Sequence, residues 1–482
     1  MEEACILQLT STGGISRASH QFTKGILEGF VSLGQEYGWI CKAVVLISYF
    51  GLAVLLLAFL CFGCPEKRPK DPKMVGSTML TVYLGAVNGL LYVATDQYIP
   101  SLPRMEVELS GSETILSGSV QLNLLSKAFV SLLVAPLSDQ IGRKPILLTC
   151  AILMILGSFG CALAPNVYWF ISARIIQSLG ESLEPLTSAI VRDCYPDPGE
   201  RLAALSVVGG MLMLGTAVGP VLGGLVASFC HWRVPFFVLS LAWAGLAHYA
   251  AVYIQETGID VKSPPSYWYS LKRVFCNQQL LMLLLAESCI QCGYFTFNAN
   301  ASYLTEAVYG KSTAATSVLM GMMTLCSGIG LMIITRSTRP VLSTAKTWMT
   351  AYSLGAGLLL AIAAVFCPDH LWAFLGSSFL MGFLYLGFLY PCYVPLTVLY
   401  LDPVEDIAGT AASFEIFFQS GPSAVYSGLA TQGLIGDGQR GLTWFQAGST
   451  VLAGAVFWLG YGSTAKEPDS ERVFEDELDK ST

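Results

Sequence analysis

The feature that most restricts the fold of this chain is a series of apolar segments, each long enough to cross a lipid bilayer. A membrane-spanning helix needs about 20 predominantly apolar residues, and twelve such segments follow Met74. They cover approximately residues 78–101, 114–137, 145–164, 167–191, 202–229, 233–254, 280–304, 314–335, 345–366, 370–397, 405–432 and 441–462. Only 12% of the residues are charged, about half the share in soluble domains. The sequence therefore predicts an all-α, multi-pass membrane protein.

The spacing of these segments predicts two six-helix halves. The longest interior break, residues 255–279, contains two adjacent prolines and separates an N-terminal half, 78–254, from a C-terminal half, 280–462. An acidic tail, 463–482, follows the last segment. We expect the break to be a cytoplasmic linker.

Basic residues gather in alternate loops, and cytoplasmic loops of membrane proteins carry the excess of Lys and Arg. With residue 78 at the cytoplasmic face, the inner loops hold most of the loop bases, and the C-terminus is expected in the cytoplasm. The inner bases are Arg143, Lys144, Arg192, Arg201, Lys262, Lys272, Arg273, Arg336, Arg339 and Lys346. The outer bases are Arg104, Arg233, Lys311 and Arg440.

Residues 1–77 form an N-terminal extension with a further apolar run, residues 43–63. Three interpretations stay open: an extra spanning helix with its N-terminus outside, a cleaved targeting segment, or an extension dispensable to the rest. The first is favoured, because the apolar run of a signal peptide is usually about 7–15 residues long.

Composition and motifs exclude several classes of function. The net charge of −7, with no basic cluster outside the loops, argues against a nucleic-acid partner. The two Cys-x-x-Cys pairs, Cys61–Cys64 and Cys289–Cys292, lack the second pair or nearby His of a metal site, and the four His are dispersed. No catalytic or nucleotide-binding motif is present. We expect no enzyme activity, no cofactor and no metal.

A short polar turn, Pro136–Pro145, lies between the second and third segments. Its informative residues are Asp139, Gly142, Arg143 and Lys144. We expect Arg143 to pair with an inner-face acid, Asp193 above all, and Asp139 to face the end of the fourth or eleventh segment.

This turn resembles the signature loop of the major facilitator superfamily, in which Gly-x-x-x-Asp-x-x-Gly-Arg-Lys/Arg recurs; the leading Gly is Ala135 here. The resemblance implies two six-helix halves and secondary transport by alternating access. It also implies a gating role for the turn.

Ionisable residues inside spanning helices are costly, so each is a functional candidate. They are Asp96, Lys127, Arg174, Glu181, Glu184, Glu287 and Glu415. Glu181 and Glu184, three residues apart, are expected to share a helix face. Either they neutralise Arg174 and Lys127 or one of them titrates, and we expect Lys127 to pair with one of the two.

Several stretches resemble the bicyclomycin-resistance-type (Bcr/CflA) drug:proton antiporters. Asp96–Pro103 resembles the end of their first helix, and Arg174–Gly180 resembles their Arg-x-x-Gln-x-x-Gly core, although Glu181 and Glu184 replace the usual Gly or Ala. The resemblance implies proton coupling through Asp96 and Arg174, which should lie near each other across the cavity of the N-terminal half. One of the two acids is a further candidate.

The fifth segment is rich in glycine and resembles the antiporter motif of the superfamily. Its motif residues are Gly215, Gly219, Pro220 and Gly223. The resemblance implies a helix weakened where the two halves rock, whereas close helix packing is the alternative.

For the substrate cavity we consider four residues, Lys127, Glu287, Tyr294 and Glu415.

The sequence thus favours a proton-coupled exporter of small amphipathic compounds. A symporter or facilitator of a small nutrient, and a non-transporting receptor or scaffold, remain alternatives. The expected partners are a small-molecule substrate, protons and the lipid bilayer. We expect a monomer, in the plasma membrane rather than an organellar membrane.

Overall fold

A computed structural model describes residues 78–195, 197–257, 272, 275–323, 341–366, 371–382, 408–434 and 438–461. Several of the expected features lie outside these residues: the apolar run 43–63, most of the linker 255–279, residues 324–335 of the eighth segment, residues 383–397 of the tenth segment and the tail 463–482.

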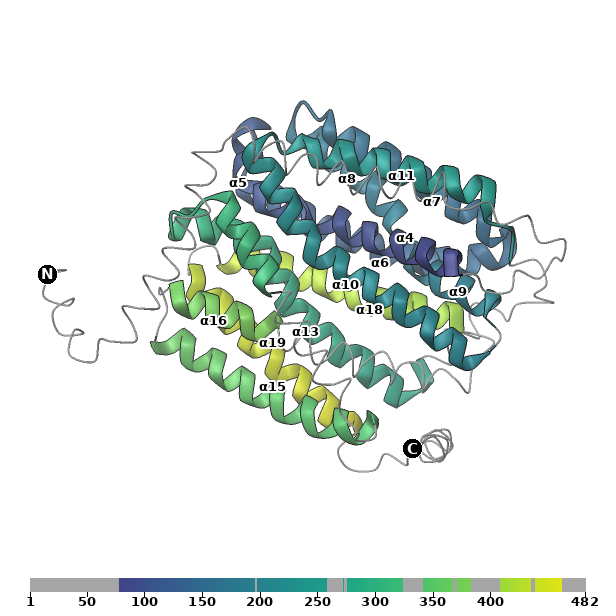
Figure 1. Cartoon of the computed structure of the whole chain (residues 1–482). Coiled ribbons are helices and arrows are strands. Elements are labelled where there is room, and N and C mark those ends of the chain that lie inside the picture. Colours follow the sequence, from purple (N-terminus) through teal and green to yellow (C-terminus); the bar gives the residue numbers. More distant parts are fainter. Residues whose placement is uncertain are drawn as a thin grey trace, which may run out of the picture. The chain divides into compact units, whose positions relative to one another are not determined.

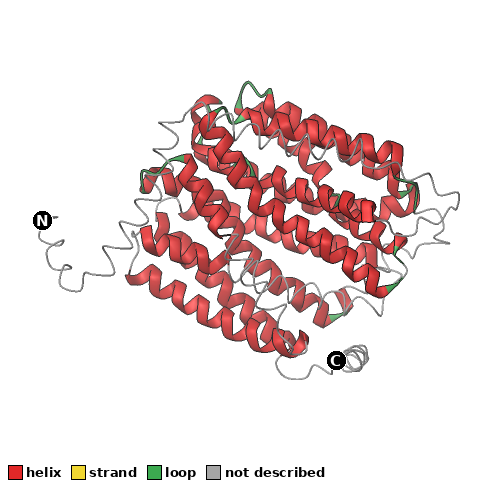
Figure 2. Cartoon of the chain, viewed as in Figure 1, coloured by secondary structure: helices red, strands yellow, loops and turns green. Residues whose placement is uncertain are grey.

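The described residues are helices joined by short turns, and none of them forms a strand (Figure 2). In chain order the labelled elements are α4 (Thr78–Asp96), η2 (Ile99–Ser101), α5 (Leu102–Glu108), α6 (Glu113–Ile141), α7 (Arg143–Ala162), α8 (Val167–Glu181), α9 (Glu184–Cys194), α10 (Pro198–Phe229), α11 (Arg233–Tyr253), α13 (Gln278–Tyr303), η3 (Leu304–Val308), α15 (Val341–Phe366), α16 (Leu371–Gly382), α18 (Ala408–Leu434) and α19 (Gly438–Tyr461). A further helix, Thr313–Met323, lies between η3 and α15. The predicted all-α class is confirmed for this part of the chain.

Short polar residues begin four of these helices. In each case the side-chain oxygen accepts a hydrogen bond from a backbone N–H three residues on, which satisfies one of the unpaired donors of a helix N-terminus. The capping residues are Ser112 before α6, Asn166 before α8, Asp197 before α10 and Asn277 before α13.

Prolines divide two of the predicted helices. In the segment predicted over 78–101, α4 ends at Asp96, and η2 and α5 follow. Pro100 lies in the first turn of η2, and Pro103 lies in the first turn of α5. The segment predicted over 167–191 is divided into α8 and α9. Pro185 is responsible, because it has no backbone N–H and its ring would clash with the carbonyl of the residue four positions earlier.

The predicted polar turn is much shorter than its sequence suggests. α6 continues to Ile141 with Pro136 inside it, and α7 begins at Arg143, so only Gly142 separates the two helices. Gly142 has φ of +111°, a backbone conformation that L side chains rarely adopt. A Cβ there would also lie 2.5 Å from Oε2 of Glu256.

The glycines of α10 bring that helix against α4 inside the N-terminal half (Figure 1). A Cβ on Gly215 would lie 2.1 Å from the carbonyl oxygen of Gly89, and one on Gly223 would lie 2.0 Å from that of Gln97. α10 runs through Pro220 without a break. The predicted hinge between the halves therefore stays a prediction, whereas the packing alternative is visible in these contacts.

The outer faces of the helices suit lipid. On α7, Ile152, Leu156 and Phe159 are exposed at helical spacing. Within the described residues, seven helices are long and apolar enough to cross a membrane. The helix Thr313–Met323 and the stretch Ser353–Phe366 of α15 are also apolar but shorter. The full count of twelve spans stays a prediction.

The two halves meet mainly where α6 packs along α18 (Figure 1). Gln121 donates to Oγ of Ser427 at 3.2 Å, and Ser131 donates to the carbonyl oxygen of Ser413 at 3.4 Å. Polar contacts therefore join the halves at two levels of this helix pair.

We expect Gly223→Ala to destabilise the protein by about 1–3 kcal/mol, because overpacking forces α10 away from α4. Gly209→Ala on the same helix is the matched control, since a Cβ there meets nothing within 4 Å. It should be neutral or slightly stabilising, because Ala favours a helix more than Gly does. Thermal unfolding of the detergent-purified protein measures both. Equal melting temperatures for the two variants would contradict the packing role.

Candidate functional site

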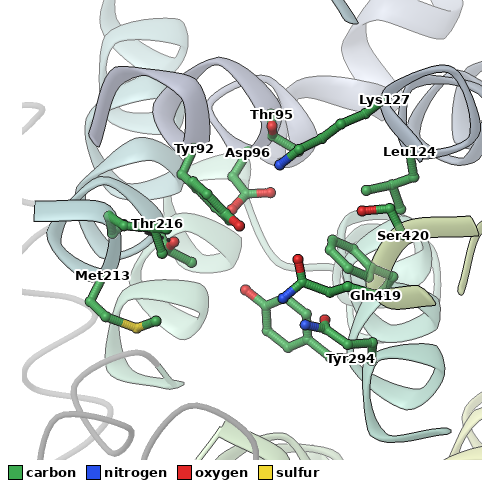
Figure 3. Close-up of a pocket in the computed structure, with 13 residues that line it drawn as sticks. Tyr92, Thr95, Asp96, Leu124, Lys127, Met213, Thr216, Tyr294, Gln419 and Ser420 are labelled. Carbon is green, nitrogen blue, oxygen red and sulfur yellow. Dashed lines mark hydrogen bonds between the residues drawn. The ribbon is translucent and has the colours of Figure 1, made fainter. Parts of the chain in front are cut away.

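A cavity lies where the two halves meet. Its wall combines α4, α6 and α10 of the N-terminal half with α13 and α18 of the C-terminal half (Figure 3). The lining residues are Tyr92, Thr95, Asp96, Leu124, Lys127, Leu212, Met213, Thr216, Gln291, Tyr294, Phe295, Gln419 and Ser420. Its volume of about 20 Å³ holds roughly one water molecule. A larger ligand therefore requires the halves to separate.

Asp96 forms part of the cavity wall at the end of α4. Its side chain is buried, and within the described residues its Oδ1 has no hydrogen-bond partner. In Figure 3, Asp96 lies with Tyr92 and Lys127 on one side of the cavity, opposite Tyr294 and Gln419. An incompletely bonded buried carboxyl group is uncommon and needs an explanation.

Arg174 lies behind this wall and is not among the lining residues, so the prediction that it faces Asp96 across the cavity is wrong in that detail. It is nevertheless close to Asp96, because its Nη1 donates to the carbonyl oxygen of Ala94 at 3.2 Å. The two side chains are also within electrostatic range of each other. The guanidinium lies 4.6 Å from the centre of the Tyr98 ring.

The charge of Arg174 is balanced by Glu181, one of the two acids that depart from the family pattern. Nη1 of Arg174 lies 3.6 Å from Oε1 of Glu181, and both side chains are only 1% exposed. Thr95 donates to Oε2 of Glu181 at 3.1 Å. Within the described residues, Nε and Nη2 of Arg174 have no hydrogen-bond partner. This buried cluster is therefore only partly satisfied.

The other acid, Glu184, pairs with Lys127. Nζ of Lys127 lies 3.0 Å from Oε2 of Glu184, with side-chain exposures of 6% and 14%. Tyr92 donates to the same oxygen at 3.2 Å, and the lysine Nζ lies 4.7 Å from the Tyr92 ring centre. The predicted pairing of Lys127 is confirmed.

The expectation that Glu181 and Glu184 share one helix face is wrong. α8 ends at Glu181 and α9 begins at Glu184, so the two side chains belong to different helices. The break that precedes Pro185 thus sends one acid toward Arg174 and the other toward Lys127.

Two of the four predicted cavity residues line the cavity. Lys127 and Tyr294 do so, whereas Glu287 and Glu415 are not among the lining residues. Glu287 is buried and accepts a hydrogen bond from Gln419 at 3.2 Å. Glu415 lies instead within electrostatic range of Glu184, across the interface between the halves.

The short connection between α6 and α7 forms a charged cluster at one end of the N-terminal half. Arg143 lies 2.6 Å from Oδ1 of Asp139 and 3.1 Å from Oδ2 of Asp193, so the predicted pairing with Asp193 is confirmed. Asp193 is on α9, which links Asp139 through Arg143 to the end of the fourth span. Lys144 donates from Nζ to the carbonyl oxygen of Ala251 at 2.8 Å.

Glu256 is a member of this cluster that the sequence did not reveal. It follows α11 and accepts hydrogen bonds from the backbone N–H groups of Arg143, at 2.6 Å, and Lys144, at 3.2 Å. A carboxylate at a helix N-terminus is favourable because of the helix dipole. No sequence motif marks Glu256.

Tyr92 is a cavity residue that the sequence analysis also missed. Its position one helical turn before Asp96 could have identified it.

We expect Lys127→Met and Glu184→Gln each to destabilise the protein by about 3–5 kcal/mol, since each leaves a buried group uncompensated. The double variant should be closer to wild type than either single one. Thermal unfolding of the purified protein measures the stability of all three variants. The control for Lys127→Met is Lys311→Met, which removes an exposed lysine. A double variant as damaged as the two single ones combined would show that the pair is not coupled.

Comparison with known proteins agrees with this architecture. The sequence profile of the Major Facilitator Superfamily matches residues 84–426, more than half of the chain. Multidrug resistance protein D of Escherichia coli is 26% identical over 393 residues, which are 81% of this chain and 96% of that protein. A chloramphenicol resistance protein of Pseudomonas aeruginosa is 28% identical over 59% of this chain and 67% of its own length.

Another relative, the uncharacterised MFS-type transporter YdgK of Bacillus subtilis, is 30% identical over 53% of this chain. The match spans 65% of that protein, slightly less than two thirds. Among solved structures, the human organic anion transporter MFSD10 (TETRAN) aligns with a TM-score of 0.59 at 20% identity, over 81% of this chain and 100% of that one. The profile match, the helical fold and the cavity between two halves together show that the chain belongs to the major facilitator superfamily of multi-pass membrane transporters.

Proposed function

We propose that this chain exports small amphipathic compounds in exchange for protons, by alternating access between its two halves. The observation that carries the proposal is Asp96, a buried carboxyl group with an unpartnered oxygen in the wall of the cavity. Relatives named for multidrug and chloramphenicol resistance support a drug-like cargo.

The cavity wall suits a cargo with an apolar body and a few polar groups. Tyr92, Tyr294 and Phe295 supply aromatic surface, and Met213 supplies an adaptable side chain. Polar groups from Asp96 and its neighbours would orient the cargo, as the few polar groups of ligand pockets commonly do.

Proton exchange would use Asp96 with Arg174 behind it. Burial disfavours the ionised carboxylate, whereas the fixed positive charge of Arg174 favours it. Opening of the cavity to water alters this balance, so proton binding and the conformation of the transporter become linked. The carboxylate of Glu181 partly neutralises the charge of Arg174. It would thereby set how strongly Arg174 affects proton binding by Asp96.

The transporter would work as a monomer in the plasma membrane, with its C-terminus in the cytoplasm. The bacterial relatives and the bias of the loop bases support this location and orientation. The cluster of Asp139, Arg143 and Asp193 would then lie at the cytoplasmic face.

The direct test is transport by the purified full-length chain in proteoliposomes with an imposed pH gradient, with ethidium and chloramphenicol as cargo. Gradient-driven export should occur in the wild type and fall to the level of empty liposomes in Asp96→Asn. The control is Glu200→Gln, an exposed acid at the start of α10, which should keep full activity. Cargo moving in the same direction as protons would indicate a symporter, and no flux of either cargo would favour a non-transporting role.

We expect Asp139→Lys to slow export about tenfold while leaving the protein inserted, since it breaks the charge-assisted contact with Arg143. Glu200→Lys is the matched control, because it reverses an exposed charge outside the cluster. Initial rates in the same proteoliposomes measure the effect, normalised to the amount of inserted protein. Full activity in Asp139→Lys would remove the gating role of this residue.

A further inference from the structure

Each wall of the cavity carries a buried side-chain oxygen that has no hydrogen-bond partner within the described residues. They are Oδ1 of Asp96 on α4 and Oε1 of Gln291 on α13, and both residues line the cavity. Asp96 is 2% exposed and Gln291 is 1% exposed. Because α4 and α13 belong to different halves, one small cavity has an unsatisfied oxygen on each side. A ligand that supplies polar hydrogens would satisfy both, since a buried acceptor without a donor is unfavourable.

The hydroxyl groups around the cavity donate their hydrogens to other parts of the protein. Tyr92 donates to Oε2 of Glu184 at 3.2 Å. Thr95 donates to Oε2 of Glu181 at 3.1 Å. Thr216 donates to a backbone carbonyl oxygen of its own helix at 3.1 Å. A ligand therefore meets the oxygen atoms of these three side chains rather than their hydrogens.

Gln419 is oriented by Glu287, a buried acid behind the C-terminal wall. Nε2 of Gln419 donates to Oε1 of Glu287 at 3.2 Å, and Glu287 is 4% exposed. A carboxylate accepts hydrogen bonds and cannot donate them, so it holds the nitrogen of the amide and leaves the carbonyl oxygen directed elsewhere. Gln419 reaches the cavity opposite Asp96 (Figure 3). Its amide therefore offers the cavity a further acceptor.

The charges at the N-terminal wall favour a cation in the cavity. Arg174 is paired with Glu181, with 3.6 Å between Nη1 and Oε1. Lys127 is paired with Glu184, with 3.0 Å between Nζ and Oε2. Asp96 adds a third carboxyl group to these two pairs. A positively charged ligand would balance it.

We propose that the cavity recognises the N–H groups of a protonated amine, and that Glu287 is a positioning residue that keeps the carbonyl oxygen of Gln419 available to them. The inference rests on the proposed function, because it names the class of cargo for the same cavity. One N–H group of the cargo would bond to Asp96, and the others to Gln291 and Gln419 on the opposite wall. An alkylammonium group has three such donors. A quaternary ammonium group has the same charge but no polar hydrogen.

A cargo of this class would join the two halves. Its ammonium group would bond to α4 on one side and to α13 and α18 on the other. Such a ligand stabilises the arrangement in which the halves are in contact, because it binds that arrangement more tightly than one in which the walls are apart.

The test compares two fluorescent compounds that differ only at the charged nitrogen, dansylcadaverine and its trimethylammonium derivative. Equilibrium binding of each to the full-length protein in detergent is measured by fluorescence, without a gradient. We expect the wild type to bind the primary amine about tenfold more tightly, because hydrogen bonds that involve a charged group are the stronger ones. Equal binding of the two compounds, or binding of neither, would overturn the inference.

Variants distinguish recognition of the N–H groups from a simple effect of size. Glu287→Gln should remove most of the preference, because a glutamine there can also donate and lets the amide of Gln419 turn over. Glu287→Asp, which keeps a carboxylate, should retain more of it. Binding of the trimethylammonium compound should stay unchanged in both variants. Glu200→Gln, which alters an exposed acid at the start of α10, is the control and should keep the full preference.

Gln291→Leu removes an oxygen that has no partner within the described residues, so it tests the inference even if Glu287→Gln fails to fold. It should weaken binding of the primary amine alone. A full preference in Gln291→Leu, or in Glu287→Gln, would overturn the role of that residue. Because binding needs no gradient, a failure of proton-driven export in proteoliposomes would leave this result intact. Export with equal binding of the two compounds would contradict only the class of cargo.

Discussion

Two buried cations dominate the N-terminal half, and each requires an acid within reach. An unpaired Arg or Lys among packed membrane helices is strongly unfavourable. Arg174 has Glu181, and Lys127 has Glu184. The break between α8 and α9 makes both pairs possible, because a continuous helix would have turned the two acids toward one face. Pro185 thus determines how charge is distributed behind and beside the cavity.

Close contact between α4 and α10 depends on the absence of side chains at Gly215 and Gly223. This contact supports the end of α4, where Asp96 and Gln97 follow one another. Gly142 has a comparable role at the end of α6, where its backbone conformation lets α7 begin at once and brings Arg143 to Asp139 and Asp193. Glycine therefore positions both charged regions of the N-terminal half, although it carries no chemistry itself.

The cavity joins two chemically different walls. The N-terminal half contributes Asp96 and Lys127, whereas the C-terminal half contributes the aromatic ring of Tyr294 and amide groups such as that of Gln419. Such a division would suit the alternating access proposed above, because the charge of Asp96 and Lys127 would stay with the N-terminal half while the C-terminal half moves. With room for roughly one water, the described arrangement has the halves in contact. Under the proposed function, cargo binding would depend on how readily the contact between α6 and α18 opens.

The sequence by itself determined the helical class and the identity of the charged residues inside the helices, because hydropathy and the high free energy of buried charge are properties of short segments. The six-plus-six division stays a prediction, since the structure describes only part of the C-terminal half. It also predicted that Arg143 pairs with the inner-face acid Asp193, and that Lys127 pairs with Glu181 or Glu184, since helix rise places Lys127 level with that part of the fourth span. The structure selects Glu184 for Lys127. The sequence did not reveal the separation of Glu181 from Glu184, the position of Arg174 behind the cavity wall, or the part that Glu256 plays. These features depend on which helix faces pack together, and that is decided by contacts between residues far apart in the chain, which only the tertiary structure specifies.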